Sequence, residues 1–431
     1  MKASLGAPVA AFCLIGAAAG VAQADTALSL PYGISVTGHV DAGVSGNPDD
    51  PANNINFGQT FNDRANSFRM NQLMLNVERD LDPKNAGYQW GFKFTGMYGT
   101  DARVTHFYNE FDRITHSPYQ FDIVEADAQS HIPWIGGGTD VKLGQYPTPI
   151  GYEVIDATGN PLYSHSYIFF YGLPFKHTGL LTTTHVNDTL DVWLGVDTGV
   201  NSWIGQKGMP NNEFPKALFG FGLNGLMGGK LTILGLSHIG PEAPRFFESS
   251  SGGIVPNPGA NNKVLQFYDM VIGYKITDAL TSTTELNYVK SDIANASAGG
   301  AATYLTYALN DQWSITGRAE AFSDQNGNFV SVGTTSLDYV NGARGLAPAF
   351  AYAGATNTGV ARYNVVYGEL TIGTTYKPAV SDRFNVMFRP ELRYDTVIGG
   401  TAGIKPFDVG ASGAGRKSSQ WTIAADVIIG F

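Results

Sequence analysis

Apolar and polar residues alternate along the last segment of the chain, from Ser419 to Phe431. The apolar set lies at odd positions: Trp421, Ile423, Ala425, Val427, Ile429 and Phe431. The even positions are small or polar, with Ile428 the exception. Because side chains alternate between the two faces of a strand, this pattern predicts an extended strand with one apolar face. A strand that ends on an aromatic residue is typical of the last strand of a bacterial outer-membrane barrel. A half-buried edge strand of a soluble sandwich is the alternative.

The same alternation recurs along the chain in segments of about ten residues, each followed by a turn or a loop. We predict strands at 33–44, 69–79, 88–98, 121–131, 140–146, 176–186, 190–198, 215–226, 230–239, 263–276, 281–291, 301–309, 312–322, 363–377, 383–396 and 419–431. The count is about sixteen, within a range of roughly 14 to 18, which is usual for a barrel with an aqueous channel. Pro390 lacks a backbone donor, so it should mark a bulge or a gap in pairing.

The connections between these strands alternate in length. Short turns are expected near Asp80, Gly137, Asn187–Asp188, Gly228–Gly229, Thr277–Asp278, Asn310–Asp311 and Ala379–Asp382. Long loops are expected near 45–66, 99–120, 147–175, 199–214, 240–262, 292–300, 323–362 and 397–418. Outer-membrane barrels have short periplasmic turns and long outer loops, whereas a soluble sandwich has no reason to alternate in this way. The fold class we predict is all-β, a transmembrane antiparallel up-and-down β-barrel.

The N-terminus has the pattern of a secretory signal peptide. Lys2 precedes an apolar run from Ala7 to Val21, and Ala22-Gln23-Ala24 forms a small-x-small cleavage site. We therefore expect residues 1–24 to be removed and residues 25–431 to form one barrel domain. Cys13, the single cysteine, leaves with the signal, so the mature chain should contain no disulfide.

Composition narrows the function classes. The formal net charge of −10 argues against nucleic-acid binding and against a polybasic membrane-surface role. The mean hydropathy lies near zero, and the sequence after the signal lacks an apolar run long enough for a spanning helix. Barrel strands hide half of their residues from lipid, so their average hydropathy is that of a soluble protein.

Charged residues fall on the polar faces of the predicted strands. The candidate pore-lining residues are Lys93, Glu125, Asp127, Arg318, Glu320, Arg389, Glu391, Arg393 and Asp395. Water inside a barrel solvates such charges, whereas on the lipid face they cost about 2–4 kcal/mol near the midplane. Structural ion pairs are the alternative role for each of them.

The segment from Lys142 to Gly179 carries the most specific sequence. Pro147 and Pro149 end a strand, and an aromatic-rich loop follows. The pieces Thr148-Pro149-Ile150-Gly151-Tyr152-Glu153, Tyr163-Ser164-His165-Ser166-Tyr167 and Pro174-Phe175-Lys176-His177-Thr178-Gly179, together with Arg389-Pro390-Glu391-Leu392-Arg393-Tyr394-Asp395, resemble the OmpL-like family of β-barrel porins. The resemblance implies an outer-membrane porin or porin-like channel and supplies no substrate.

We hypothesise that loop 147–175 folds into the lumen and narrows the pore. Glu153 and Asp156 would then face Arg318, Arg389 and Arg393 on the opposite wall. Opposed charges create a transverse field that orders water and selects polar solutes. The alternative is an outer loop whose aromatic residues form a small core of their own.

The predicted function is passive diffusion of small hydrophilic solutes or ions through the bacterial outer membrane. A structural or surface-recognition barrel without an open pore is the alternative, and an outer-membrane enzyme is a weaker one. The sequence predicts no enzyme, no cofactor and no metal site. Expected partners are outer-membrane lipid, the barrel assembly machinery, which would read Phe431 as an assembly signal, and two further copies in a homotrimer.

Overall fold

The computed structural model describes residues 27–82, 85–107, 110–111, 118–202, 214–243, 246–248, 254–292, 295–327, 329–330, 363–380, 383–409 and 415–431. The signal peptide predicted over residues 1–24 lies outside this part of the chain.

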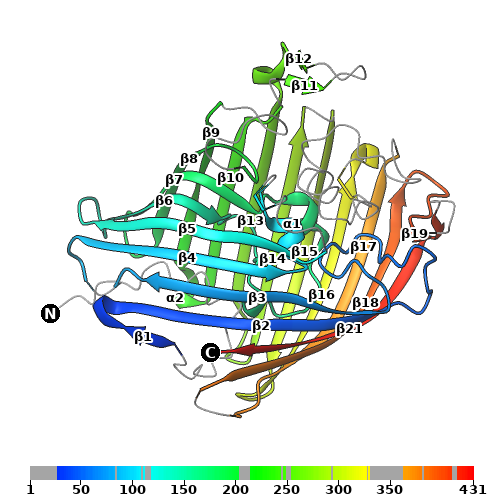
Figure 1. Cartoon of the computed structure of the whole chain (residues 1–431), viewed down its shortest axis with the longest axis horizontal. Coiled ribbons are helices and arrows are strands. Elements are labelled where there is room, and N and C mark those ends of the chain that lie inside the picture. The colour runs from blue at the N-terminus through cyan, green and yellow to red at the C-terminus, as the bar shows by residue number, and fades with distance from the viewer. Residues whose placement is uncertain are drawn as a thin grey trace.

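Sixteen long strands form the wall of the molecule (Figure 1). They are β2 (Ile34–Gly46), β3 (Ser67–Arg79), β4 (Gln89–Gly99), β5 (Gln120–Ile132), β6 (Thr139–Pro147), β7 (Lys176–His185), β8 (Leu190–Asp197), β9 (Lys216–Gly225), β10 (Leu231–Pro241), β13 (Val264–Lys275), β14 (Leu280–Ser291), β15 (Ala296–Ala308), β16 (Trp313–Asp324), β17 (Val365–Tyr376), β18 (Asn385–Gly400) and β21 (Ser419–Gly430). Each pairs antiparallel with its neighbours in the chain, so the connections need no crossover.

The sheet closes because the last long strand pairs with the first. In this seam β21 lies antiparallel to β2, with Val40 opposite Ile429. The backbone of Phe431 completes the ladder by two hydrogen bonds with Gly38, of 2.9 and 3.1 Å. The closed antiparallel barrel predicted from the sequence is therefore confirmed, as is the pairing of its terminal strands. Closure leaves no long edge strand exposed.

A short strand completes the pairing of β2 beyond the seam. β1 (Leu28–Leu30) pairs with β2, with Leu30 opposite Ile34. The two strands are joined by the turn η2 (Pro31–Gly33), in which Tyr32 and Gly33 have φ of 67° and 73°. This left-handed turn reverses the chain so that β1 covers an edge that β21 does not reach.

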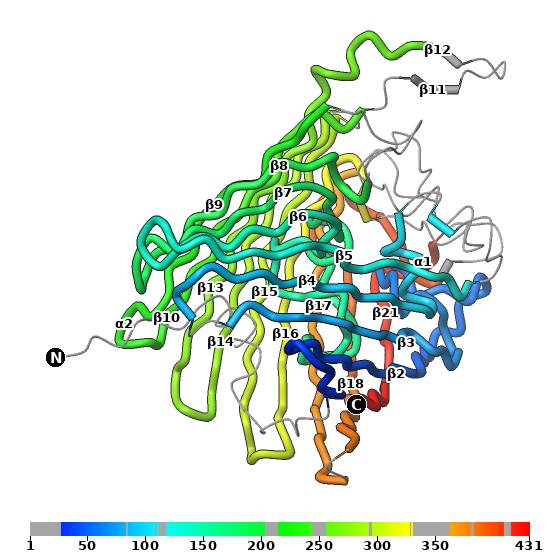
Figure 2. Tube along the Cα trace, turned by 60° about the vertical axis from the view of Figure 1, so that its left-hand side comes forward, coloured from blue at the N-terminus to red at the C-terminus, as the bar shows by residue number. Residues whose placement is uncertain are grey.

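The connections differ in length at the two ends of the barrel, as predicted. Figure 2 shows the hairpins between β13 and β14 and between β15 and β16 at one end, and β12 at the opposite end. The short end also holds α2 (Leu226–Gly229). The long connections contain α1 (Ala102–Thr105), η3 (Ala157–Gly159), η4 (Ile168–Gly172), β11 (Phe246–Glu248), β12 (Ile254–Pro256), η5 (Ala260–Asn262), η6 (Gln325–Gly327), β19 (Phe407–Val409) and β20 (Gly415–Lys417).

One detail of the sequence prediction changes, and a second is decided between its two predicted alternatives. The connection expected over 292–300 is short, because β14 ends at Ser291 and β15 already begins at Ala296. Pro390 marks a gap rather than a bulge. The β17–β18 register passes from Gly373 opposite Glu391 to Tyr376 opposite Phe388 without an extra residue. Among the described residues, no helix is both long and apolar enough to cross a membrane.

The two faces of the wall differ in chemistry. On β21 the side chains of Trp421 and Ile429 are exposed on the outside, whereas Asp426 is buried on the inside, as the alternation predicts. The outer face exposes apolar side chains on many of the other strands, among them Leu73, Leu194, Leu305, Leu370 and Ile372. The inner face carries buried polar and charged residues. The barrel thus presents hydrocarbon to lipid and keeps its charges inside.

Candidate functional site

The connection between β6 and β7 lies against the inner wall of the barrel. We call residues 148–175 the lumen loop. Pro147 and Pro149 prevent β6 from continuing, and the chain then runs inward. Most of the lumen loop is buried, residues 162–175 throughout, and the loop includes the turns η3 and η4. Irregular backbone buried in this way needs hydrogen-bond partners for its N–H and C=O groups, which the wall must supply.

Carboxylates on the inner wall accept hydrogen bonds from backbone N–H groups of the lumen loop. Glu285 of β14 accepts from Tyr152 at 3.1 Å. Glu320 of β16 accepts from Tyr167 at 2.7 Å and from Ile168 at 2.8 Å. These bonds place the loop against the β14–β16 side of the wall. They also give each buried carboxylate a fixed structural partner.

Glu391 of β18, two strands beyond β16, also accepts hydrogen bonds from the lumen loop. Its carboxylate accepts from the N–H groups of Tyr163, at 2.9 Å, and Ser164, at 3.1 Å. The hydroxyl of Tyr163 reaches further and donates to Asn71 Oδ1 of β3 at 3.1 Å. The loop therefore contacts the inner wall at several strands from β14 to β3.

Three inner-wall arginines donate hydrogen bonds to backbone carbonyl groups of the lumen loop. Arg318 of β16 pairs with Glu369 of β17 through Nε at 3.0 Å, and its Nη1 donates to the carbonyl of Ser164 at 2.7 Å. Arg393 of β18 pairs with Asp395 at 2.7 Å and donates to the carbonyl of His165. Each guanidinium thus has one edge on a wall carboxylate and the other on the loop.

Arg389 of β18 holds the turn η3 in the same way. It pairs with Asp426 of β21, and its Nη1 donates to the carbonyls of Ala157 at 2.8 Å, Asn160 at 2.7 Å and Leu162 at 3.1 Å. The fork of a guanidinium suits this divided role, because its five N–H groups point in fixed directions.

Glu153 contacts Arg318, one of the three arginines expected to face it, whereas Asp156 contacts none of the three. Glu153 Oε1 lies 2.7 Å from Arg318 Nη1, and its other oxygen accepts from the N–H of Ser166 at 2.8 Å. Burial alone would raise the pKa of the Glu153 carboxyl, but the charges of Arg318 and His165 and the hydrogen bonds from Ser166 together outweigh burial and lower that pKa. Asp156 instead caps η3 by accepting from Thr158 N, and the Nε2 of His39 on β2 lies 3.9 Å from its carboxylate.

These contacts change what the predicted pore-lining residues are expected to do. Arg318, Arg389, Arg393, Glu320, Glu391 and Asp395 are buried and bonded to the loop or to one another. Each of these charged groups has a hydrogen-bond partner on the lumen loop or on the wall. Binding the loop is thus the role that their geometry supports.

Aromatic side chains pack the lumen loop against the wall and against a second loop. Tyr167 stacks on Tyr367 of β17, with ring centroids 5.2 Å apart. Phe169 packs edge-on to Phe61, from the connection between β2 and β3, at 5.7 Å. That second loop also approaches through Gly58, where an added Cβ would lie 2.7 Å from the Tyr167 ring. No sequence signal indicated that residues 47–66 contribute to the packing.

The remaining candidate residues lie apart from the lumen loop, on β4 and β5. Lys93 Nζ lies 3.2 Å from Glu78 and 3.7 Å from Glu125. Lys142 Nζ lies 2.8 Å from Glu125 and 3.9 Å from Asp127. We call these five residues the β3–β6 charge cluster. The side chains of Lys93 and Lys142 are 33% and 38% exposed, whereas that of Arg393 is 0% exposed.

Sequence reasoning missed one group of residues altogether. His177, Asp197 and His238 come together at the opposite end of β7 from its turn, although they are far apart in the sequence. Only the register of β7 to β10 brings them into contact, so no local motif could have revealed them. The sequence predicted no metal site here.

Comparison with known proteins agrees with the fold and with the motif in the loop. The family described as "Putative beta-barrel porin-2, OmpL-like" matches residues 33–431. No curated protein sequence matches the chain.

Solved structures of outer-membrane channels share the architecture. The anion-selective porin from Comamonas acidovorans aligns with a TM-score of 0.53 and 11% identity, over 92% of this chain and 99% of that one. The outer membrane channel DcaP of Acinetobacter baumannii gives 0.51 and 11%, over 94% and 99%. OprB of Pseudomonas putida, in its high-pH structure, gives 0.53 and 10%, over 93% and 94%. At such identities the likeness concerns the fold alone.

Proposed function

This chain belongs to the OmpL-like β-barrel porin family, and we propose that small hydrophilic solutes cross its barrel along the inner wall of β3 to β6. As a member of that family it is a porin of the bacterial outer membrane. The route and the type of solute are our proposal.

The contrast in exposure between the two sides of the inner wall carries this proposal. On the side of β14 to β18 the charged side chains are covered by the lumen loop and bonded to it. On the side of β3 to β6, Lys93 and Lys142 keep about a third of their side-chain surface exposed. Water reaches the second set, and this access of water is the observation on which the proposed route rests.

The β3–β6 charge cluster suits polar solutes of either sign. Its two lysines and its carboxylates Glu78, Glu125 and Asp127 lie within 4 Å of one another in pairs. Mixed charges in a narrow passage order water and favour polar solutes over apolar ones. The lumen loop would narrow the passage and so set an upper limit on solute size.

Single-channel recording in a KCl gradient tests the route. The double variant Lys93→Glu/Lys142→Glu reverses two charges that face water. We expect the reversal potential to shift toward cation selectivity. The control is Lys275→Glu, which reverses one charge at an exposed position at the end of β13 and so reports the effect of a charge reversal outside the cluster. A reversal potential equal to that of the control would contradict the proposed route.

A loop deletion tests the narrowing separately. A variant lacking residues 152–172 should show a higher unit conductance, because most of the lumen loop is gone. Unchanged conductance would show that the loop does not limit passage. Liposome swelling with a series of sugars gives the size limit for the intact protein. No flux for any sugar would favour the alternative function, a structural or surface-recognition barrel without an open pore.

A further inference from the structure

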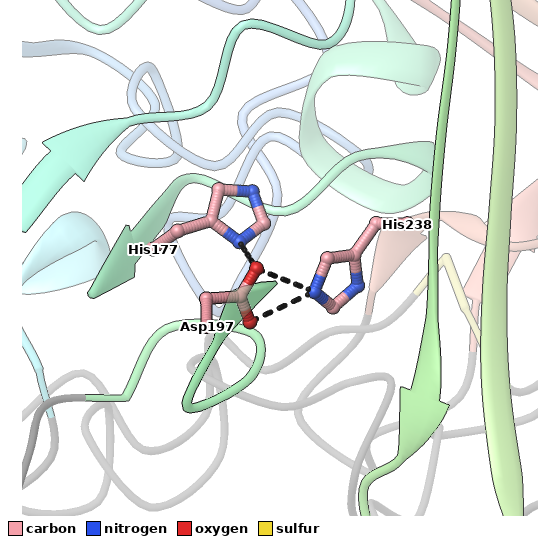
Figure 3. A group of neighbouring side chains, drawn as sticks. All are labelled: His177, Asp197 and His238. Carbon is pink, nitrogen blue, oxygen red and sulfur yellow. Dashed lines mark hydrogen bonds and ion pairs between the residues drawn. The ribbon is translucent and has the colours of Figure 1, made fainter. Parts of the chain in front are cut away.

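Two histidines and one aspartate converge inside the barrel wall, away from the lumen loop's contacts with β14 to β18. Figure 3 shows His177 of β7 and His238 of β10 on either side of the Asp197 carboxylate of β8. His238 Nε2 lies 3.0 and 3.1 Å from the two carboxylate oxygens. His177 Nδ1 lies 3.4 Å from the nearer one. All three side chains are fully buried.

The ring of His177 is held by its other nitrogen. Nε2 lies 3.0 Å from Thr148 Oγ1, at the start of the lumen loop. Nδ1 points at Asp197 at ion-pair distance but outside good hydrogen-bond geometry, and the Tyr146 hydroxyl has no hydrogen-bond partner among the described residues. The Tyr146 ring lies beside that of His177, at 5.8 Å between centroids. If Nε2 carries the proton, the lone pair of Nδ1 faces a carboxylate oxygen, which is repulsive unless a cation lies between them.

The spacing of the three donor atoms fits such a cation. Imidazole nitrogens and carboxylate oxygens bind Zn²⁺ at about 2.0–2.2 Å, so neighbouring ligand atoms in a tetrahedral site lie about 3.3 Å apart. Here the nitrogen–oxygen separations are 3.0 to 3.4 Å, and all the ligand atoms lie within 4.8 Å of one another. A hydrogen bond between Thr148 and the outer nitrogen of His177 is the usual way in which a ligating imidazole is oriented.

We propose that His177, Asp197 and His238 bind one divalent transition-metal ion of the kind that prefers imidazole and carboxylate ligands, such as Zn²⁺. The three residues leave one position of a tetrahedral site for a water molecule, and the Tyr146 hydroxyl is one of the nearby polar groups without a hydrogen-bond partner. Imidazole ligands favour zinc, nickel and copper over calcium or magnesium.

The local charges are compatible with a bound cation. Asp197 supplies one negative charge, and the other charged groups acting on His238 are Glu242 and Lys216. Glu242 accepts from the N–H of Val200 at 3.0 Å, and Lys216 donates to the carbonyl of Thr198 at 2.8 Å. These opposite charges offset one another, so Asp197 remains to balance the ion.

The position of the site suggests a structural role. It would link β7, β8 and β10 directly, and through Thr148 it would hold the start of the lumen loop. Strands β7 and β10 are not neighbours in the sheet, because β8 and β9 lie between them. An ion there would fasten the wall and the loop to each other.

Metal content and metal spectra of the refolded mature protein test this inference. The protein must lack a histidine tag, and it is refolded with Zn²⁺ and then dialysed without metal. We expect about one retained equivalent of zinc per chain. With Co²⁺ we expect the strong visible absorption of a four-coordinate site, and with Cu²⁺ an electron paramagnetic resonance spectrum split by two nitrogens. No retained ion, or a copper spectrum without two nitrogen ligands, would overturn the proposal.

Substitutions assign the ion to these residues. Asp197→Asn, His177→Ala and His238→Ala should each weaken binding by at least about tenfold. The matched controls are Asp191→Asn and His185→Ala, since His185 and Asp191 form another histidine–aspartate pair, partly buried and 2.7 Å apart, on β7 and β8. The controls should retain the ion. Equal retention by Asp197→Asn, or loss of the ion in His185→Ala, would contradict the assignment. The wild-type spectra decide the question if a variant fails to refold.

Discussion

Arg318 Nη1 lies 2.7 Å from Glu153 Oε1, and this pair joins the barrel wall to the lumen loop. Arg318 also bonds Glu369 on the neighbouring strand and the backbone carbonyl of Ser164. The guanidinium therefore bonds to the barrel wall and to the lumen loop at the same time. Since all of these groups are buried, neither carboxylate has water as a substitute partner.

Replacing this guanidinium should destabilise the barrel. Arg318→Met keeps much of the side-chain volume but leaves Glu153 and Glu369 buried without their cation, and breaking a buried pair in this way costs about 3–5 kcal/mol. Urea unfolding in detergent measures the loss. The double variant Arg318→Met/Glu369→Gln should recover part of it. Lys275→Met, at an exposed ion pair, should cause no measurable change. Full stability of Arg318→Met would mean that the loop does not depend on this contact.

His165 should make the barrel less stable at acid pH. Burial, with help from the charges of Arg318 and Arg389 and against that of Glu153, lowers the pKa of His165 to about 4. Below pH 6.5 the unfolded chain gains a proton that the folded state refuses, so stability is complete above pH 6.5 and falls as the pH drops toward 4. The linkage amounts to about 3 kcal/mol.

The comparison with His165→Gln isolates this effect. Glutamine does not titrate, so the variant should lose less stability than the wild type between pH 7.5 and pH 4.5 in urea unfolding. Other groups in the loops contribute in the opposite direction, since burial raises the pKa of Asp101 and that of Glu110 to about 7. They contribute equally to both proteins. Identical pH profiles would show that His165 gains a proton without cost.

Gly43 of β2 leaves the space that the Tyr163 ring occupies. A Cβ at Gly43 would lie 2.5 Å from the phenol of Tyr163 and 2.9 Å from the carbonyl of Ala425. Gly43→Ala should therefore displace this end of the lumen loop and change the unit conductance. Gly46→Ala on the same strand is the control, because its nearest atom lies 3.5 Å away. Equal conductance in the two variants would show that the position of Tyr163 does not affect the width of the passage.

Phe431 should matter for assembly more than for selectivity. Its backbone pairs with Gly38, and its ring lies against the same glycine. Deleting Phe431 removes both contacts, whereas Phe431→Ala removes only the ring. We expect both variants to reach the membrane in lower yield, by heat-modifiable mobility on gels, with the selectivity of the assembled fraction unchanged. Normal yield of the deletion variant would disprove the role of Phe431 as an assembly signal. Homotrimerisation stays a prediction, which crosslinking in membranes would test.

Strand positions were predictable because one physical rule acts at every position of the wall. Each strand separates lipid from the interior, so polarity alternates with a period of two, as at Trp421 and Asp426. The prediction was wrong where this contrast disappears. Residues 296–301 are Ala, Ser and Gly, whose small side chains suit either face, so the start of β15 was placed too late.

The site was predictable only in part, since its contacts depend on register between distant segments. Pro147 and Pro149 indicated where the lumen loop begins. The alternation of apolar and polar residues placed Arg318 and Arg393 on the inner face. Neither signal says that a guanidinium bonds backbone carbonyls. Asp197 and His238 are 41 positions apart in the sequence, and they meet because β8, β9 and β10 pair in one register.

The short strand β1 has a consequence for how barrels meet one another. The seam stops where Phe431 pairs with Gly38, so residues 34–36 would offer free backbone donors and acceptors at the rim. β1 occupies those groups from the same chain. A barrel without residues 28–30 would present a short adhesive edge, on which a second barrel or a passing peptide could add a strand. Residues 28–30 thus cover an edge that could otherwise accept a strand from a second molecule.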